Sequence, residues 1–88
     1  MFRDEEEQVM GAKIQKVKYA INKVLEGCVN ELPEVQFGWS GSTIEVYLFG
    51  GNYQTRNVIE SHFVNSRKYR GVEVSNKDTE KRISFVLA

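Results

Sequence analysis

The sequence predicts an α+β fold: a single domain, residues 1–88, in which two helices cover one face of a four-stranded sheet. The first observation is a long amphipathic helical segment at the start of the chain. The second is a hairpin pattern directly after it, and the third is the recurrence of helix and hairpin in the second half. Helix, strand, strand, helix, strand, strand is the order of a two-layer αββαββ sandwich.

Length and composition agree with one small globular domain. Of the 88 residues, 41% are hydrophobic and 27% are charged, which is ordinary for a globular protein. The 12 basic and 12 acidic side chains cancel, so no strong field favours a nucleic acid or a membrane. Residues 1–49 hold five basic and eight acidic side chains, and residues 50–88 hold seven and four. This polarity can orient a partner or pair two subunits.

Three features indicate a cytoplasmic protein. Cys28 is the only cysteine, which rules out an intrachain disulfide and favours a reducing compartment. No apolar run approaches the ~18 residues of a membrane span. The opening stretch MFRDEEEQ is acidic and lacks the apolar core of a signal peptide.

The first helix is expected over residues 4–32. Asp4 and Glu7 have the spacing of a capping box, and Pro33 stops the helix at or before Leu32. Apolar residues recur at alternating spacings of four and three, which predicts one buried stripe. The stripe consists of Met10, Ile14, Val17, Ile21, Val24 and Cys28.

The first hairpin is predicted from both its pattern and its turn. Apolar and polar residues alternate in the strands 34–40 and 43–49. A two-residue loop at Gly41-Ser42, with glycine first as a type II′ turn requires, pairs Trp39 with Ile44. The same register places every apolar residue of the two strands on one face. That face is expected to be Val35, Phe37, Trp39, Ile44, Val46 and Leu48.

The second half repeats the order. A helix over residues 53–68 follows Gly50-Gly51, with Asn52 or Thr55 as its cap. Strands 72–75 and 82–87 form the second hairpin, and a turn at Asp78-Thr79 would pair Val74 with Ile83 and Val72 with Phe85. The inward face of the helix is Val58, Ile59, His62 and Phe63.

This order resembles a circularly permuted ferredoxin-like fold, because moving the first strand of βαββαβ to the end yields αββαββ. The resemblance implies a sheet order of 1-2-4-3 with both helices on one face. Strands two and four would be central, and we expect them to run parallel. They are the most apolar strands, as central strands should be.

The uncovered face of such a sheet is the expected working surface. Tyr47 and Phe49, with Val86 beside them, would project from it as a protein interface. The two rings also resemble the base-stacking aromatics of an RRM sheet. That resemblance supports the alternative, single-stranded RNA or DNA binding, in which basic side chains would assist. These are Arg67, Lys68, Arg70 and Arg82.

Other surfaces carry weaker signals. A helix over residues 4–32 would be longer than the sheet, so Val9 and Met10 are expected on an overhang that needs a partner. Gly50-Gly51-Asn52 before a helix is better explained by a tight turn than by phosphate binding. His62 is the only histidine and is expected to be structural, because a Cys28–His62 pair requires the two helices to lie side by side.

We therefore expect a small non-catalytic binding module that occludes or tethers a protein partner. It would be homodimeric and would resemble viral accessory or inhibitor proteins in kind. The residues form no metal-ligand pattern and no cofactor motif, so neither a metal nor a cofactor is expected.

Overall fold

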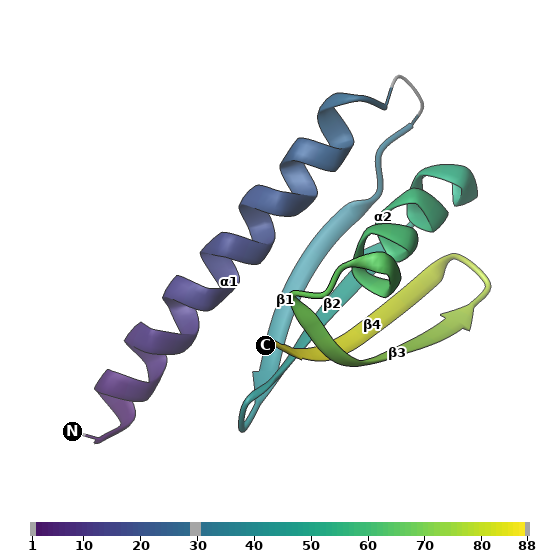
Figure 1. Ribbon diagram of the computed structural model, residues 1–88. Helices are drawn as coiled ribbons and strands as arrows, with labels where there is room; N and C mark the ends of the chain where they lie inside the picture. Colours follow the sequence, from purple (N-terminus) through teal and green to yellow (C-terminus); the bar gives the residue numbers. More distant parts are fainter. Residues whose placement is uncertain (1, 29–30, 88) are drawn as a thin grey trace.

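The computed structural model describes residues 2–28 and 31–87 and, for side chains, residues 9–28 and 31–87. Two helices lie on one face of a four-stranded sheet whose order is β1-β2-β4-β3, which confirms the predicted fold class (Figure 1). The elements are α1 (Phe2–Glu26), β1 (Glu34–Ser40), β2 (Thr43–Phe49), α2 (Tyr53–Asn65), β3 (Tyr69–Lys77) and β4 (Glu80–Leu87).

The central strands β2 and β4 are antiparallel, so the expectation that they run parallel is wrong. The connectivity explains the direction. The crossover through α2 carries the chain from β2 to β3 in the same direction, and the tight β3–β4 hairpin then reverses it. Each pair of neighbouring strands is consequently antiparallel.

The first hairpin has the predicted register. Trp39 pairs with Ile44, Phe37 with Val46 and Val35 with Leu48. Gly41 has φ 61°, the positive value that the first residue of a two-residue hairpin turn needs. The β2 side chains Ile44, Val46 and Leu48 are fully buried beneath the helices.

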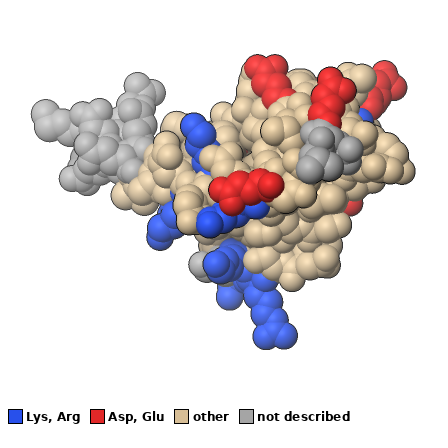
Figure 2. Space-filling view, turned by 90° about the horizontal axis from the view of Figure 1, so that it is seen from above, with Lys and Arg blue, Asp and Glu red and all other residues tan. Residues whose placement is uncertain are grey.

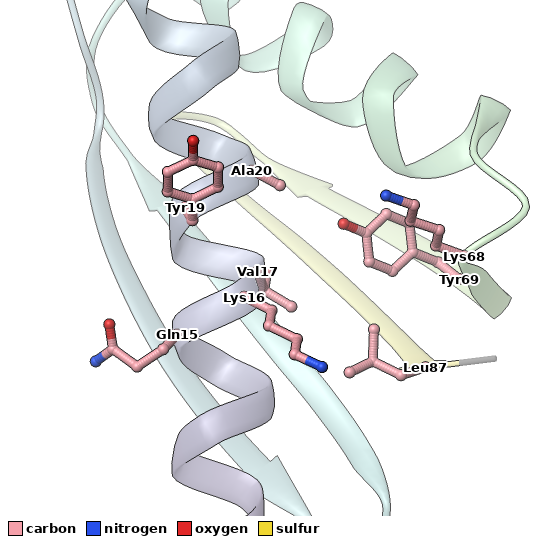
Figure 3. Close-up of a pocket in the computed structure, with 8 residues that line it drawn as sticks. All are labelled: Gln15, Lys16, Val17, Tyr19, Ala20, Lys68, Tyr69 and Leu87. Carbon is pink, nitrogen blue, oxygen red and sulfur yellow. The ribbon is translucent and has the colours of Figure 1, made fainter.

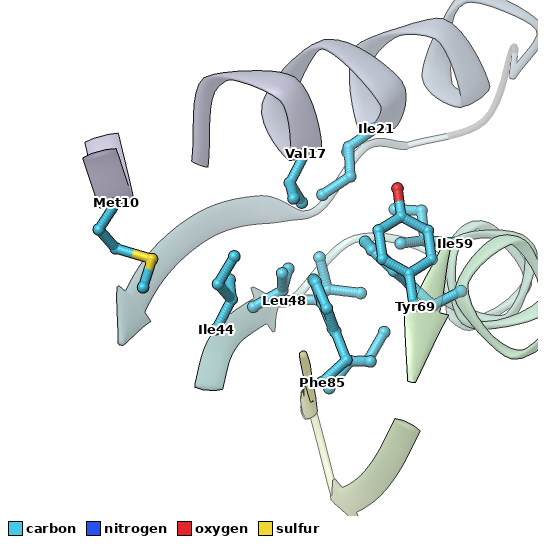
Figure 4. Close-up of a cluster of buried hydrophobic side chains, with 11 residues drawn as sticks. Met10, Val17, Ile21, Ile44, Leu48, Ile59, Tyr69 and Phe85 are labelled. Atoms are coloured by element: carbon cyan, nitrogen blue, oxygen red, sulfur yellow. The ribbon is translucent and has the colours of Figure 1, made fainter. Parts of the chain in front are cut away.

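The core lies between the helices and the sheet (Figure 4). Its centre is an aromatic cluster in which the ring centroids of Phe63 and Phe85 are 4.8 Å apart. Tyr69 lies 4.7 Å from Phe63 and 4.8 Å from Phe85. The buried hydrophobic residues are Met10, Val17, Ile21, Ile44, Val46, Leu48, Ile59, Phe63, Tyr69, Ile83 and Phe85.

Both helices end earlier than the sequence indicates. α1 ends at Glu26, where the amides of Gly27 and Cys28 bond to carbonyls three residues back and tighten the last turn. α2 ends at Asn65, because Ser66 is extended and its hydroxyl accepts from the Lys68 amide. α1 also begins at Phe2, before the expected cap; the side chains of Asp4 and Glu7 lie outside the described part.

The second hairpin is longer than expected and contains a bulge. The Asp78-Thr79 turn and the Val74–Ile83 pair are confirmed. The Val72–Phe85 pair is wrong, because the register shifts between Arg70 and Glu73. Gly71, at φ 62°, supplies the left-handed residue of this bulge. The extra residue rotates Tyr69 onto the helix-covered face, where it is 8% exposed.

The start of α1 follows the sheet further than predicted. Met10 is only 6% exposed and belongs to the core, so its placement on an uncovered overhang is wrong. Val9 is 56% exposed and is available to solvent. Neither helix, over its described residues, is long and apolar enough to cross a membrane.

Candidate functional site on the open sheet face

The sheet face opposite the helices carries a half-exposed apolar band on its two central strands. Ile44, Val46 and Leu48 point to the helices, so the alternation of β2 directs Tyr47 and Phe49 to the other side. Val86 of β4 lies on the same side, paired with Thr43. Neither helix covers this face within the described residues (Figure 1). The structure therefore brings Tyr47 and Phe49 together, whereas Val86 lies further along the same face, opposite Thr43.

Tyr47 is held in place by its neighbours on β2. Its ring lies 6.3 Å from that of Phe49 at an interplanar angle of 10°, so the two rings form a stacked pair along the strand. Its hydroxyl donates to the Glu45 carboxylate. That hydrogen bond is the main cause that raises the pKa of Tyr47, and Arg82 opposes it. An ordered aromatic pair loses little conformational entropy when a partner covers it.

The open face carries charged residues of both signs. Arg82 pairs across the strands with Tyr47, and Lys77 pairs with Glu80. Ser75, Lys77, Glu80 and Arg82 surround a shallow hollow of about 130 Å³ beside the aromatic pair. By strand alternation, the face carries Glu34, Glu45, Glu73 and Glu80 and also Arg70, Lys77 and Arg82. The face thus has no single sign of charge.

The predicted basic cluster is not one patch. Arg67 and Lys68 lie in the turn after α2, and Arg70 lies on the open face, opposite Val86. Tyr69, between them, points into the core. Figure 2 shows Lys and Arg side chains mainly on the lower side of that view and Asp and Glu mainly on the upper side. The basic residues expected to assist base stacking are thus divided between different surfaces.

Lys81 is a buried cation on the helix side of the sheet. It is 4% exposed and lies under α2, where its ammonium donates to Asn57 Oδ1 at 3.1 Å and pairs with the Glu60 carboxylate. The expected strand began at residue 82, which left Lys81 in a turn. A strand that begins at Glu80 puts Lys81 on the same face as Ile83 and Phe85 by alternation.

A groove on the helix side was not predicted. It has a volume of about 640 Å³ and lies between α1 and the ends of β3 and β4 that carry Tyr69 and Leu87 (Figure 3). Lys16 and Lys68 stand at its rim, and Tyr19 is 64% exposed on α1. A two-helix layer leaves part of a four-stranded sheet uncovered, which accounts for the groove.

Cys28 and His62 are not brought together as a nucleophile and a base. The Cys28 thiol lies past the end of α1 and donates to the Val24 carbonyl at 3.6 Å. His62 Nε2 lies 3.4 Å from the Tyr69 hydroxyl. Burial, with a smaller effect from Lys68, lowers the pKa of His62, and burial raises the pKa of Tyr69. These contacts are those of a structural histidine.

Gly51, the second glycine before α2, packs closely against the backbone of Pro33. A Cβ on Gly51, at φ 68°, would lie 2.5 Å from Pro33 N. Asn52, one of the two predicted caps, is the N-cap of α2. Its side chain accepts a hydrogen bond from the Gln54 amide at 2.7 Å. In the part of the chain that the structure describes, no group of three or more His, Cys, Asp or Glu could hold a metal ion.

No family model, curated protein or solved structure matches this chain. Functional inference therefore rests on the geometry of its surfaces.

Proposed function

We propose that this protein is a small non-catalytic binding module that occludes or tethers a protein partner through its open sheet face. The observation that carries the proposal is the ordered aromatic pair Tyr47–Phe49 on a central strand, uncovered by either helix. Aromatic side chains at the centre of a patch, with charged residues around them, are typical of protein interfaces. A viral-type accessory or inhibitor protein working in the cytoplasm is the kind of protein we envisage.

The charges of the face favour a protein partner over a nucleic acid. Glu45 accepts a hydrogen bond from Tyr47, so a carboxylate stands beside the ring on which a base would stack. A nearby phosphate would be repelled by this carboxylate. A protein surface, in contrast, can match charges of both signs with its own charges.

Single-stranded nucleic acid remains the second candidate because of one observation. The rings of Tyr47 and Phe49 are nearly parallel, and Arg82 is the cross-strand neighbour of Tyr47. Stacked aromatics beside an arginine can hold unpaired bases without sequence preference. The two candidates differ in their response to salt, since phosphate binding weakens steeply as salt increases.

The test compares two double variants. In each, two hydrophobic side chains are replaced by serine. Tyr47→Ser with Phe49→Ser removes the open-face pair, and Tyr19→Ser with Val58→Ser is the control on the helices. Tyr19 and Val58 are 64% and 47% exposed, so the expectation that Val58 faces inward is wrong and the control should fold normally. Proteins retained by the wild type are identified, purified and measured for direct binding to each variant.

We expect the open-face variant to bind at least about 30-fold more weakly, because truncating a central interface aromatic commonly costs ~2 kcal/mol. The control should bind as the wild type does. Equal binding by the open-face variant, or loss only in the control, would refute the proposal. Tight, salt-sensitive binding of single-stranded oligonucleotides, lost in the open-face variant, would support the second candidate instead.

A further inference from the structure

We infer that the partner covering the open sheet face is a second copy of this chain, related by a two-fold axis that runs parallel to the strands between β2 and β4. This inference rests on the proposed function, because it names the occupant of the same face. The arrangement of charge and shape on the face complements itself in this one orientation.

The side chains of the open face lie in four rows across the sheet. The strand pairings define the rows. In the order β1, β2, β4, β3, the first row is Glu34, Phe49, Glu80 and Lys77, and the second is Gln36, Tyr47, Arg82 and Ser75. The third row is Gly38, Glu45, Ser84 and Glu73, and the last is Ser40, Thr43, Val86 and Arg70.

A two-fold axis parallel to the strands keeps each row and reverses the order of the strands. β1 then faces β3 of the second copy, and β2 faces β4. Glu34 meets Lys77 of the second copy, and Tyr47 meets Arg82. The remaining carboxylates face neutral residues or an aromatic ring, so no like charges are directly opposed.

Shape agrees with this orientation. The aromatic pair of one copy lies over the hollow of about 130 Å³ that Ser75, Lys77, Glu80 and Arg82 form on the other. An arginine guanidinium stacks favourably on a tyrosine ring, so Arg82 at the edge of the hollow can cover Tyr47 of the other copy. Each copy therefore offers both the projecting rings and the hollow that receives them, as an isologous interface requires.

The other face-to-face orientation is less favourable. A two-fold axis perpendicular to the strands places each strand over itself and exchanges the first row with the last. Lys77 would then face Arg70 of the second copy, twice in each dimer. Directly opposed like charges destabilise an interface.

The size of the face sets the expected affinity. Four strands of about seven residues cover roughly 23 Å by 19 Å. Burying that face on two copies removes on the order of 900 Å² of surface, below the 1,200–2,000 Å² of stable interfaces. We therefore expect a weak dimer that dissociates on dilution.

The decisive experiment uses Glu34 and Lys77, which lie on opposite edges of the sheet. Three strand spacings, roughly 14 Å, separate them within one chain, so they cannot pair there. Energetic coupling between these positions can therefore arise only between two copies. Sedimentation equilibrium from ~1 µM to ~1 mM is measured for the wild type, Glu34→Lys, Lys77→Glu and the double exchange.

Each single exchange should raise the dimer Kd about tenfold, because two attractions become two repulsions. The double exchange should restore the Kd to within about threefold of the wild type. Tyr47→Glu should be monomeric. The control exchanges Glu26→Lys and Lys18→Glu, at exposed positions of α1, should leave the Kd unchanged.

Three outcomes would overturn the inference. A wild type that stays monomeric at ~1 mM excludes the dimer, and the proposed function then stands or falls on the partner-binding comparison above. A dimer in which the double exchange shows no restoration excludes this orientation. A dimer that survives Tyr47→Glu uses another surface.

Discussion

Replacing Glu60 by Gln should destabilise the protein more than replacing the buried Lys81 by Met. Glu60→Gln leaves the Lys81 ammonium, 4% exposed, with a neutral partner and Asn57 as its only other hydrogen-bond acceptor in the described structure. Removing one member of a buried ion pair costs ~3–5 kcal/mol, because the remaining charge is uncompensated. The Glu60 side chain is 32% exposed, so solvent relieves part of this cost and we expect about 1–3 kcal/mol.

Lys81→Met removes the buried charge and keeps most of the side-chain volume. The Glu60 carboxylate can then turn to solvent, so we expect a cost of about 0–1 kcal/mol. The double variant should be more stable than Glu60→Gln alone, because it no longer holds an unpaired ammonium. A double variant that is more stable than Glu60→Gln would show that the unpaired buried charge, and not only the lost contact, causes the destabilisation.

The assay is urea unfolding followed by helical circular dichroism, with Glu26→Gln on the exposed face of α1 as control. The control should change the free energy of unfolding by less than ~0.5 kcal/mol. The reasoning fails if Glu60→Gln behaves as the control does, or if Lys81→Met is the more damaging of the two single changes.

Three further predictions follow from packing, backbone conformation and protonation. Phe85→Ala should lower the free energy of unfolding by about 3–5 kcal/mol; a loss under ~1 kcal/mol in urea unfolding would contradict its burial at 1% exposure. Gly51→Ala should be much more destabilising than Gly50→Ala in thermal unfolding, because both have positive φ but only Gly51 touches the Pro33 backbone; equal shifts would contradict this. Burial lowers the pKa of His62, so as pH falls the unfolded chain binds a proton at this position before the folded chain does. The free energy of unfolding should therefore decrease as pH falls below ~6.5. If His62→Gln showed the same dependence of the free energy of unfolding on pH as the wild type, this prediction would be contradicted.

Those parts of the fold in which local pattern and turn chemistry agree were predictable from the sequence. The first hairpin is the clearest case, because the loop at Gly41-Ser42 and the alternation of both strands specify the same register. The sheet order followed from the order of the elements. The strand directions depend on the number of chain reversals between the strands, and the expectation of parallel central strands overlooked the reversal at the second hairpin.

Element ends were less predictable because tertiary contacts decide them. The expected end of α1 rested on Pro33 and on the apolar stripe that continues to Cys28, yet α1 stops at Glu26, directly before Gly27, a residue type that commonly follows the end of a helix. In β3, a single left-handed glycine at position 71 shifts the alternation by one residue. The sequence shows a glycine there but not whether it ends a loop or makes a bulge. Its effect is large, since it buries Tyr69 and separates the residues of the predicted basic cluster.

Residues that stabilise the fold and residues proposed to bind a partner lie on opposite faces of the sheet. Effects on stability and on binding can therefore be measured separately. Lys81, Phe85 and Tyr69 act on the helix side, where substitutions should change the free energy of unfolding. Tyr47 and Phe49 lie on the opposite side, half-exposed and outside the buried core cluster. Their replacement should therefore leave the unfolding midpoint nearly unchanged while it alters association. If open-face variants lost stability and binding in parallel, loss of the fold would explain both results. Such a result would not support the open face as the binding surface.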